Sequence, residues 1–263
     1  MDRQLILVST LCFLVAVVYT LATLRDGVFR RRLFSFIAIA TGFIFQSAFL
    51  SVRGHALGRC PITNLFEVFV FLAWSMALIY LVIGPAYRLS LMGAFTAPLV
   101  LLIQGAALLA PIDIPHSFRI RANPWLEFHA SMSMIAYGAF ALSCVAGVMY
   151  LVQERQLKTH QLHSIFYHLP PLTNLFSALT RLLWLGFALY TAGLVSGFFA
   201  GGPLPRLKIT CAIAVWVFYA LILQVRYLHR LAPKRIATLC IFAFTAAISV
   251  LWAINFVSDN RPT

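Results

Sequence analysis

The sequence predicts an all-α polytopic membrane protein with about eight transmembrane helices. Apolar residues make up 62% of the 263 residues, charged residues make up 10%, and the mean hydropathy is +0.90. Soluble domains carry about 25% charged residues, so this composition excludes an ordinary soluble enzyme. The apolar residues form runs of roughly 20 residues, the length that a helix needs to cross the hydrocarbon core. A membrane β-barrel would show shorter segments of alternating polarity.

Eight apolar runs define the expected spans. They cover residues 5–24, 33–51, 65–84, 90–110, 125–152, 181–200, 208–226 and 236–256. The connections between them are short, so we expect a single transmembrane domain over residues 1–263. Polar residues after position 152 predict that the fifth helix continues beyond the membrane before the Pro170-Pro171 break. The first run lacks a small-residue cleavage site before Arg25, which predicts a retained helix and not a signal peptide.

Basic residues dominate the charge of the chain. Lysine and arginine number 20 against seven acidic residues, which gives a formal charge of +13. They lie in the short connections, where such residues orient a membrane protein and meet anionic lipid, so we expect no binding to nucleic acid. Twelve fall on one side of the predicted membrane and eight on the other. The positive-inside rule then places both termini outside the cytoplasm in a multi-pass protein of the bacterial inner membrane.

Ionisable residues inside the spans are few, and each is a candidate functional group because insertion at mid-membrane costs roughly 2.5–3.5 kcal/mol. Glu67, Glu127 and His129 fall in the first turns of their helices, near the outer surface and away from the midplane. Their position disfavours a small-solute transporter, for which Pro98 and Gly105 in the fourth span, with Gln104 between them, give the only hint. The chain contains no motif of a hydrolase, an NTPase or a dehydrogenase, so no enzymatic activity of these kinds is expected.

The fifth span carries the most informative pattern. At 3.6 residues per turn, His129, Met132, Ser133 and Tyr137 share one face. An imidazole near the membrane surface, with aromatic residues such as Trp125 around it, is what an axial heme ligand needs. A structural histidine that hydrogen-bonds a neighbouring helix is the alternative reading of the same pattern.

The third span presents Glu67, Phe71 and Trp74 on one face. Asn64, three residues before Glu67, forms a capping-box pattern with it and predicts the start of the helix. The hexapeptide around Asn64 is similar to the one around Asn174, where the same chemistry predicts a second N-cap. Capping explains this echo more simply than an internal repeat does.

Two further histidines lie in the predicted outer connections. His55 and His116 could each supply a second axial ligand on the same side as His129, whereas an exposed loop histidine is more often solvated. The five cysteines include no C-x-x-C pair, which argues against a thiol–disulfide relay and against covalent attachment of heme to this chain.

The segment Cys60-Pro-Ile-Thr-Asn-Leu-Phe-Glu67 is followed by Phe71-Leu-Ala-Trp74, and the fifth span combines Trp125, His129 and Tyr137. These segments occur in the order and approximate spacing typical of the cytochrome c assembly family of CcsA-type integral membrane proteins, which the chain resembles from about residue 58 to residue 257. Between Gly197 and Arg206, where that family has a tryptophan-rich loop, this chain has no tryptophan. The profile is therefore most similar to the HemX-like and YpjD-like branch.

The resemblance implies a protein that binds or handles heme at the extracytoplasmic face, together with other cytochrome c assembly membrane proteins. His129 falls at the position of an external histidine ligand of heme iron. The porphyrin would pack against Phe71, Trp74, Trp125 and Tyr137, and Glu67 would hydrogen-bond the imidazole or cap its own helix. The alternative function is a scaffold or regulatory subunit of the same assembly system that does not bind heme.

Overall fold

The computed structural model describes residues 2–25, 32–84, 92–109, 113, 123–159, 171–201, 206–228 and 231–259. These residues form eight α-helices, each long and apolar enough to span a membrane, which confirms the predicted all-α polytopic class. The helices are α1 (Asp2–Arg25), α2 (Arg32–Leu57), α3 (Leu65–Ile83), α4 (Met92–Leu109), α5 (Pro124–Thr159), α6 (Leu172–Phe199), α7 (Arg206–Tyr227) and α8 (Pro233–Asp259).

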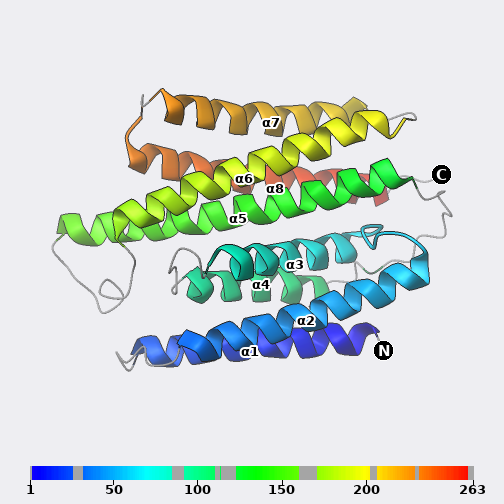
Figure 1. Ribbon diagram of the computed structural model, residues 1–263, viewed down its shortest axis with the longest axis horizontal. Coiled ribbons are helices and arrows are strands. Elements are labelled where there is room, and N and C mark those ends of the chain that lie inside the picture. The colour runs from blue at the N-terminus through cyan, green and yellow to red at the C-terminus, as the bar shows by residue number, and fades with distance from the viewer. Residues whose placement is uncertain are drawn as a thin grey trace.

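The eight helices divide into two groups of four (Figure 1). In the first group α1 packs on α2 and α4, and α3 packs on α2 and α4; in the second, α5 packs on α6 and α8, and α7 packs on α6 and α8. The two groups meet mainly where α3 contacts α5, and these two helices are the most buried of the eight. Successive helices run in opposite directions, so α1 begins and α8 ends at the same end of the bundle (Figure 1).

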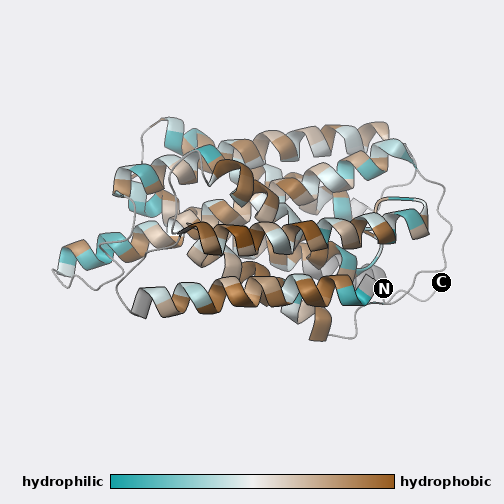
Figure 2. Cartoon of the chain, turned by 60° about the horizontal axis from the view of Figure 1, so that its bottom comes forward, coloured by the Kyte–Doolittle hydropathy of each residue, from teal (hydrophilic) through white to brown (hydrophobic). Residues whose placement is uncertain are grey.

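The outer surface of the bundle is apolar, as a lipid-facing surface must be. Leu11, Leu21, Leu102 and Phe242 are each more than half exposed. Figure 2 shows hydrophobic residues along the middle of the helices and hydrophilic residues mainly toward their ends. A soluble monomer rarely exposes so continuous an apolar surface, so we treat the eight helices as transmembrane segments.

Gln104 makes a polar link within the first group of helices. Its side chain is fully buried, and its amide nitrogen donates to Thr10 Oγ1 at 2.7 Å and to the Ile6 carbonyl at 3.1 Å. Its amide oxygen accepts a hydrogen bond from Gln46 Nε2 at 2.5 Å. The residue thus connects α4 to α1 and α2, and Pro98 lies inside a helix that continues to Leu109. These contacts account for Gln104 as part of helix packing.

The start of α6 differs from the sequence prediction. The predicted span began at residue 181, but the helix begins at Leu172, directly after Pro171. Its first turn is closed by the Asn174 and Leu175 amides, which donate to the Pro171 carbonyl. The predicted N-cap at Asn174 is therefore wrong, because this residue lies inside the first turn. The preceding helix, α5, continues to Thr159, which confirms its predicted extension.

Candidate functional site

Four of the described candidates, His55, Glu67, Trp125 and His129, lie at one end of the bundle, where α2 and α6 end and α3 and α5 begin (Figure 1). His55 lies in the last turn of α2, Glu67 in the first turn of α3, and His129 near the start of α5. The antiparallel order of the helices produces this arrangement, because alternate connections fall at the same end.

His129 lies against α6. Its Nδ1 atom is 2.6 Å from the carbonyl oxygen of Gly193, and the imidazole is half-buried. A carbonyl oxygen only accepts hydrogen bonds, so Nδ1 must carry the proton, and the neutral ring then has its lone pair on Nε2. Metal-binding histidines are usually held in this way, with one ring nitrogen donating to a backbone carbonyl and the other facing the metal. A histidine that serves only to join two helices would make the same hydrogen bond. This contact is therefore expected both for a heme ligand and for a purely structural histidine.

Asn123 joins the start of α5 to the end of α6. Its side-chain oxygen accepts from the Trp125 amide at 3.1 Å, and its backbone oxygen accepts from the Glu127 amide at 3.0 Å. Its side-chain nitrogen donates to the Ala200 carbonyl at 2.6 Å. This residue holds the two helix ends that flank His129, and the sequence analysis missed it. An asparagine directly before Pro124 is the signal that could have identified it, since asparagine favours N-caps and proline favours the first helical position.

The two aromatic candidates of α5 lie at different depths. Trp125 is 52% exposed and packs against Phe199 of α6, with ring centroids 5.5 Å apart. It is four residues from His129 and therefore on the same helix face. Tyr137 lies two turns deeper, is buried, and packs edge-on against Tyr190 with centroids 5.9 Å apart. Of the two, Trp125 is the aromatic residue at the end of the bundle with His129.

Trp74 of α3 packs against α2, and Phe71 lies beside Trp74 on the same helix. The Trp74 indole nitrogen donates to Ser47 Oγ at 2.8 Å, and its ring stacks on Phe43 with centroids 5.5 Å apart. Phe71 is buried beside Trp74. The contacts of Trp74 are with α2, whereas the hydrogen bond of His129 is with α6. A place for Phe71 and Trp74 beside a bound porphyrin stays a prediction.

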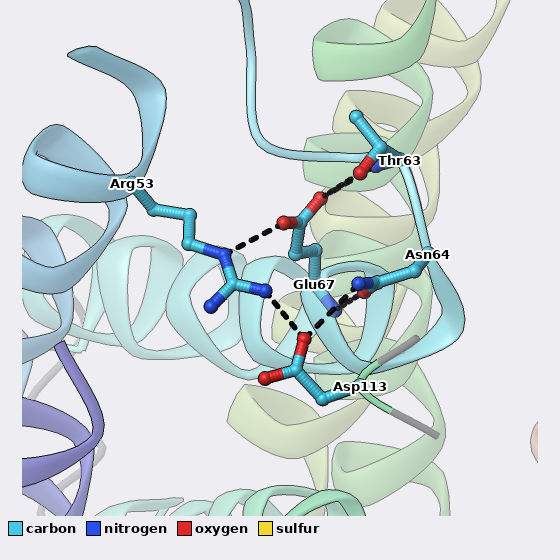
Figure 3. Close-up of polar contacts among 5 residues, drawn as sticks. All are labelled: Arg53, Thr63, Asn64, Glu67 and Asp113. Atoms are coloured by element: carbon cyan, nitrogen blue, oxygen red, sulfur yellow. Dashed lines mark hydrogen bonds and ion pairs between the residues drawn. The ribbon is translucent and has the colours of Figure 1, made fainter. Parts of the chain in front are cut away.

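Glu67 is the centre of a polar network (Figure 3). Arg53 and Asp113 belong to this network, and neither was identified as a candidate from the sequence. Its side chain is only 1% exposed, and Oε1 accepts from Arg53 Nε at 2.9 Å. Oε2 accepts from the backbone nitrogen and the hydroxyl of Thr63, both at 2.7 Å. Arg53 also pairs with Asp113, which accepts from Asn64 Nδ2 at 3.1 Å. The network joins α2, the start of α3 and the connection after α4.

Asn64 caps α3 as predicted, because its side-chain oxygen accepts from the Glu67 amide at 2.8 Å. The Glu67 side chain completes the cap through Thr63, one residue before the N-cap. Of the two roles expected for Glu67, the structure shows the capping role, since the Nδ1 partner of His129 is Gly193. Arg53 is one of the eight basic residues on this side of the predicted membrane, and no sequence pattern connects it to Asp113, 60 residues away.

The candidates for a second ligand are less closely held. His55 is exposed, and its ring makes no hydrogen bond to another described residue. His116 lies outside the described residues. Among the residues that the structure describes, no cluster of three or more His, Cys, Asp or Glu side chains could hold a metal ion.

Cys60 lies beside α5 in the connection before α3. Its sulfur is 3.4 Å from Ser131 Oγ. Burial raises the pKa of the Cys60 thiol above its usual value, and the negative charges of Glu127 and Glu67 act in the same direction. The thiol is therefore protonated at neutral pH, which makes it a weak nucleophile and a packing residue.

The chain matches the family described as cytochrome C assembly protein over residues 62–259, which include all of α3 to α8. It is similar to proteins named cytochrome c biogenesis protein CcsA. The relative from Porphyra purpurea is 26% identical over 261 residues, covering 80% of each chain. The relative from Mesostigma viride is 22% identical over 264 residues, covering 87% of this chain and 85% of its own. As the match extends over most of the sequence, this chain belongs to the cytochrome c assembly protein family.

Proposed function

We propose that this chain acts in cytochrome c biogenesis and holds heme at the end of the bundle formed by the start of α5 and the end of α6. The family and the names of its relatives support the biogenesis role. The hydrogen bond between His129 Nδ1 and the Gly193 carbonyl carries the proposal for heme, because it leaves Nε2 with a lone pair for iron.

The surroundings of His129 suit a porphyrin. Trp125 and Phe199 offer exposed aromatic faces at the same end of the bundle, and flat aromatic surfaces pack well against a macrocycle. Bound heme would be the cargo that is passed on for attachment to a cytochrome. His129 would coordinate the iron, and the carbonyl of Gly193 would fix the orientation of the ring. The opposite ligand would come from His55, His116 or another protein of the assembly system.

The charge distribution supports an orientation for this site. With twelve basic residues on the opposite side and eight on this one, the positive-inside rule favours an extracytoplasmic position for the site end and for both termini. We therefore place the chain in the inner membrane of a bacterium, with heme handled on the side where c-type cytochromes are matured.

The proposal is tested by the visible absorption spectrum of the detergent-purified protein and of His129→Ala. A Soret band in the wild type that is lost or shifted in the variant is the expected result. Val148→Ala changes an exposed position of the same helix, away from the site, and should leave the spectrum unchanged. A colourless wild type that also fails to bind added hemin contradicts heme binding and favours the scaffold or regulatory function.

A further inference from the structure

The imidazole of His129 occupies space that only a glycine of α6 leaves open. A Cβ atom on residue 197 would lie 2.8 Å from Nδ1, 3.2 Å from Cε1 and 3.3 Å from Cγ of the His129 ring. Real Cβ atoms do not approach a neighbour as closely as 2.8 Å. The ring therefore lies directly over the backbone of Gly197, one helical turn after the carbonyl that accepts its Nδ1 proton.

Backbone conformation does not explain this glycine. Gly197 lies inside the helix α6, whereas among the described residues the glycines with positive φ are Gly58 and Gly201. A glycine inside a helix weakens it relative to alanine, because the unfolded chain has more freedom to lose. The position therefore gains from glycine only through what lies against it, and that neighbour is His129.

The carbonyl of Gly193 is held in place as well. It accepts the hydroxyl of Ser196 at 2.7 Å in addition to Nδ1 of His129 at 2.6 Å. Two side-chain donors therefore converge on this carbonyl oxygen, which has two lone pairs. The segment from Gly193 to Gly197 thus provides an acceptor for Nδ1 at one end and clearance for the ring at the other.

We infer that Gly197 is a positioning residue for His129: the missing side chain lets the imidazole reach the Gly193 carbonyl, which fixes the proton on Nδ1 and leaves Nε2 for a ligand. The inference rests on the proposed function for its purpose, since it concerns the same imidazole. Its geometry can be tested without heme.

A double-mutant cycle tests the steric part. Gly197→Ala should lower the midpoint temperature of unfolding in detergent when His129 is present. In a His129→Ala background the same change should have no destabilising effect, because the new Cβ fits the space that the ring has left. The matched control is Gly186→Ala in the same helix, whose Cβ would meet Phe140 at 2.6 Å. Its effect should be the same in both backgrounds.

The tautomer of His129 tests the positioning part. In protein with ¹⁵N-labelled imidazoles, the His129 signals are identified by their loss in His129→Gln. The wild type should show a protonated Nδ1 and an unprotonated Nε2, Gly186→Ala should keep this pattern, and Gly197→Ala should lose it. A wild type protonated on Nε2, an unchanged tautomer in Gly197→Ala, or an effect of Gly197→Ala that is equal in both backgrounds of the cycle would overturn the inference.

A hemin titration of the same samples separates this inference from the proposed function. If Gly197 positions a ligand, Gly197→Ala should weaken hemin binding at least tenfold while Gly186→Ala leaves it unchanged. A wild type that has the expected tautomer and binds no hemin refutes the heme proposal but supports the positioning of the ring. If Gly197→Ala binds hemin as tightly as the wild type does, the positioning role is refuted and the heme proposal is not.

Discussion

Arg53 connects three segments that are far apart in the sequence. Its guanidinium bonds Glu67 of α3 and Asp113 after α4, while its own backbone belongs to α2. Glu67 is 1% exposed and Arg53 is 20% exposed, so loss of the arginine would leave a nearly buried carboxylate without its counter-ion. Removing one partner of a buried pair costs about 3–5 kcal/mol, more than the pair itself contributes.

We therefore expect Arg53→Gln to lower the free energy of unfolding by about 2–4 kcal/mol, the partial exposure of Arg53 reducing the full effect. Adding Glu67→Gln should recover part of the loss, because the buried charge is then removed as well. Denaturant titration of the two single variants and the double variant in detergent measures this coupling. Losses that simply add would show that the two side chains act independently.

Single residues could be predicted from the sequence where their chemistry is local. Asn64 and Glu67 lie three residues apart and form their cap within one turn, so the pattern was sufficient. Arg53 and Asp113 are 60 residues apart, and only the packing of the helices brings them together. The contact of His129 with Gly193 also joins residues that are far apart in the sequence. The sequence therefore identified the histidine as a candidate but not the carbonyl oxygen that orients it.

Among the helices, α4 depends on a buried amide for its contacts with α1 and α2. Gln104→Leu removes the acceptor of the Gln46 side-chain nitrogen and leaves this buried donor unsatisfied. The side-chain oxygen of Gln46 already lacks a partner among the described residues. An unsatisfied buried donor costs about 1–3 kcal/mol. We expect the single variant to be destabilised by about that amount and the double variant Gln46→Leu with Gln104→Leu to be less so.

Thermal unfolding of both variants in detergent checks this expectation. A double variant that is less stable than Gln104→Leu alone would contradict it, because two apolar side chains of similar size should restore the packing between α1, α2 and α4.

At the level of helices, hydropathy predicted the number and order of the spans, since lipid requires a long apolar run for each crossing. It failed at the start of α6, where the residues before Arg181 mix polar and apolar side chains. In the structure Leu175, Ala178 and Leu179 are buried while Thr173 and Asn174 are exposed. A helical segment with one buried face can be identified only when the element that it packs against is known, and the sequence alone does not reveal that element.

The part of the chain that the structure describes forms eight helices, with successive helices antiparallel and both of its ends on one side of the bundle (Figure 1). We expect this side to be extracytoplasmic, as the basic residues are more frequent on the other. An alkaline phosphatase fused after residue 263 should therefore be active in a bacterial host, and a fusion in the connection between α5 and α6 should be inactive. The reverse pattern would place the His129 end in the cytoplasm.

The two groups of four helices differ in what they contribute. The first group supplies Arg53, Asp113 and the amide link of Gln104, which hold helices together, and the second supplies His129 with the end of α6. The division could not be predicted from hydropathy, because all eight spans have similar apolar composition. It follows from α3 and α5 packing against each other at the centre of the bundle.

Binding of hemin to His129→Gly, measured with and without added imidazole, tests the central claim most directly. Glycine removes the side chain and leaves a space over Gly197 that a free imidazole can enter. The account predicts that the variant loses the hemin affinity and the Soret position of the wild type, and that imidazole restores both. Hemin binding by His129→Gly that matches the wild type without imidazole would contradict ligation of the iron by His129.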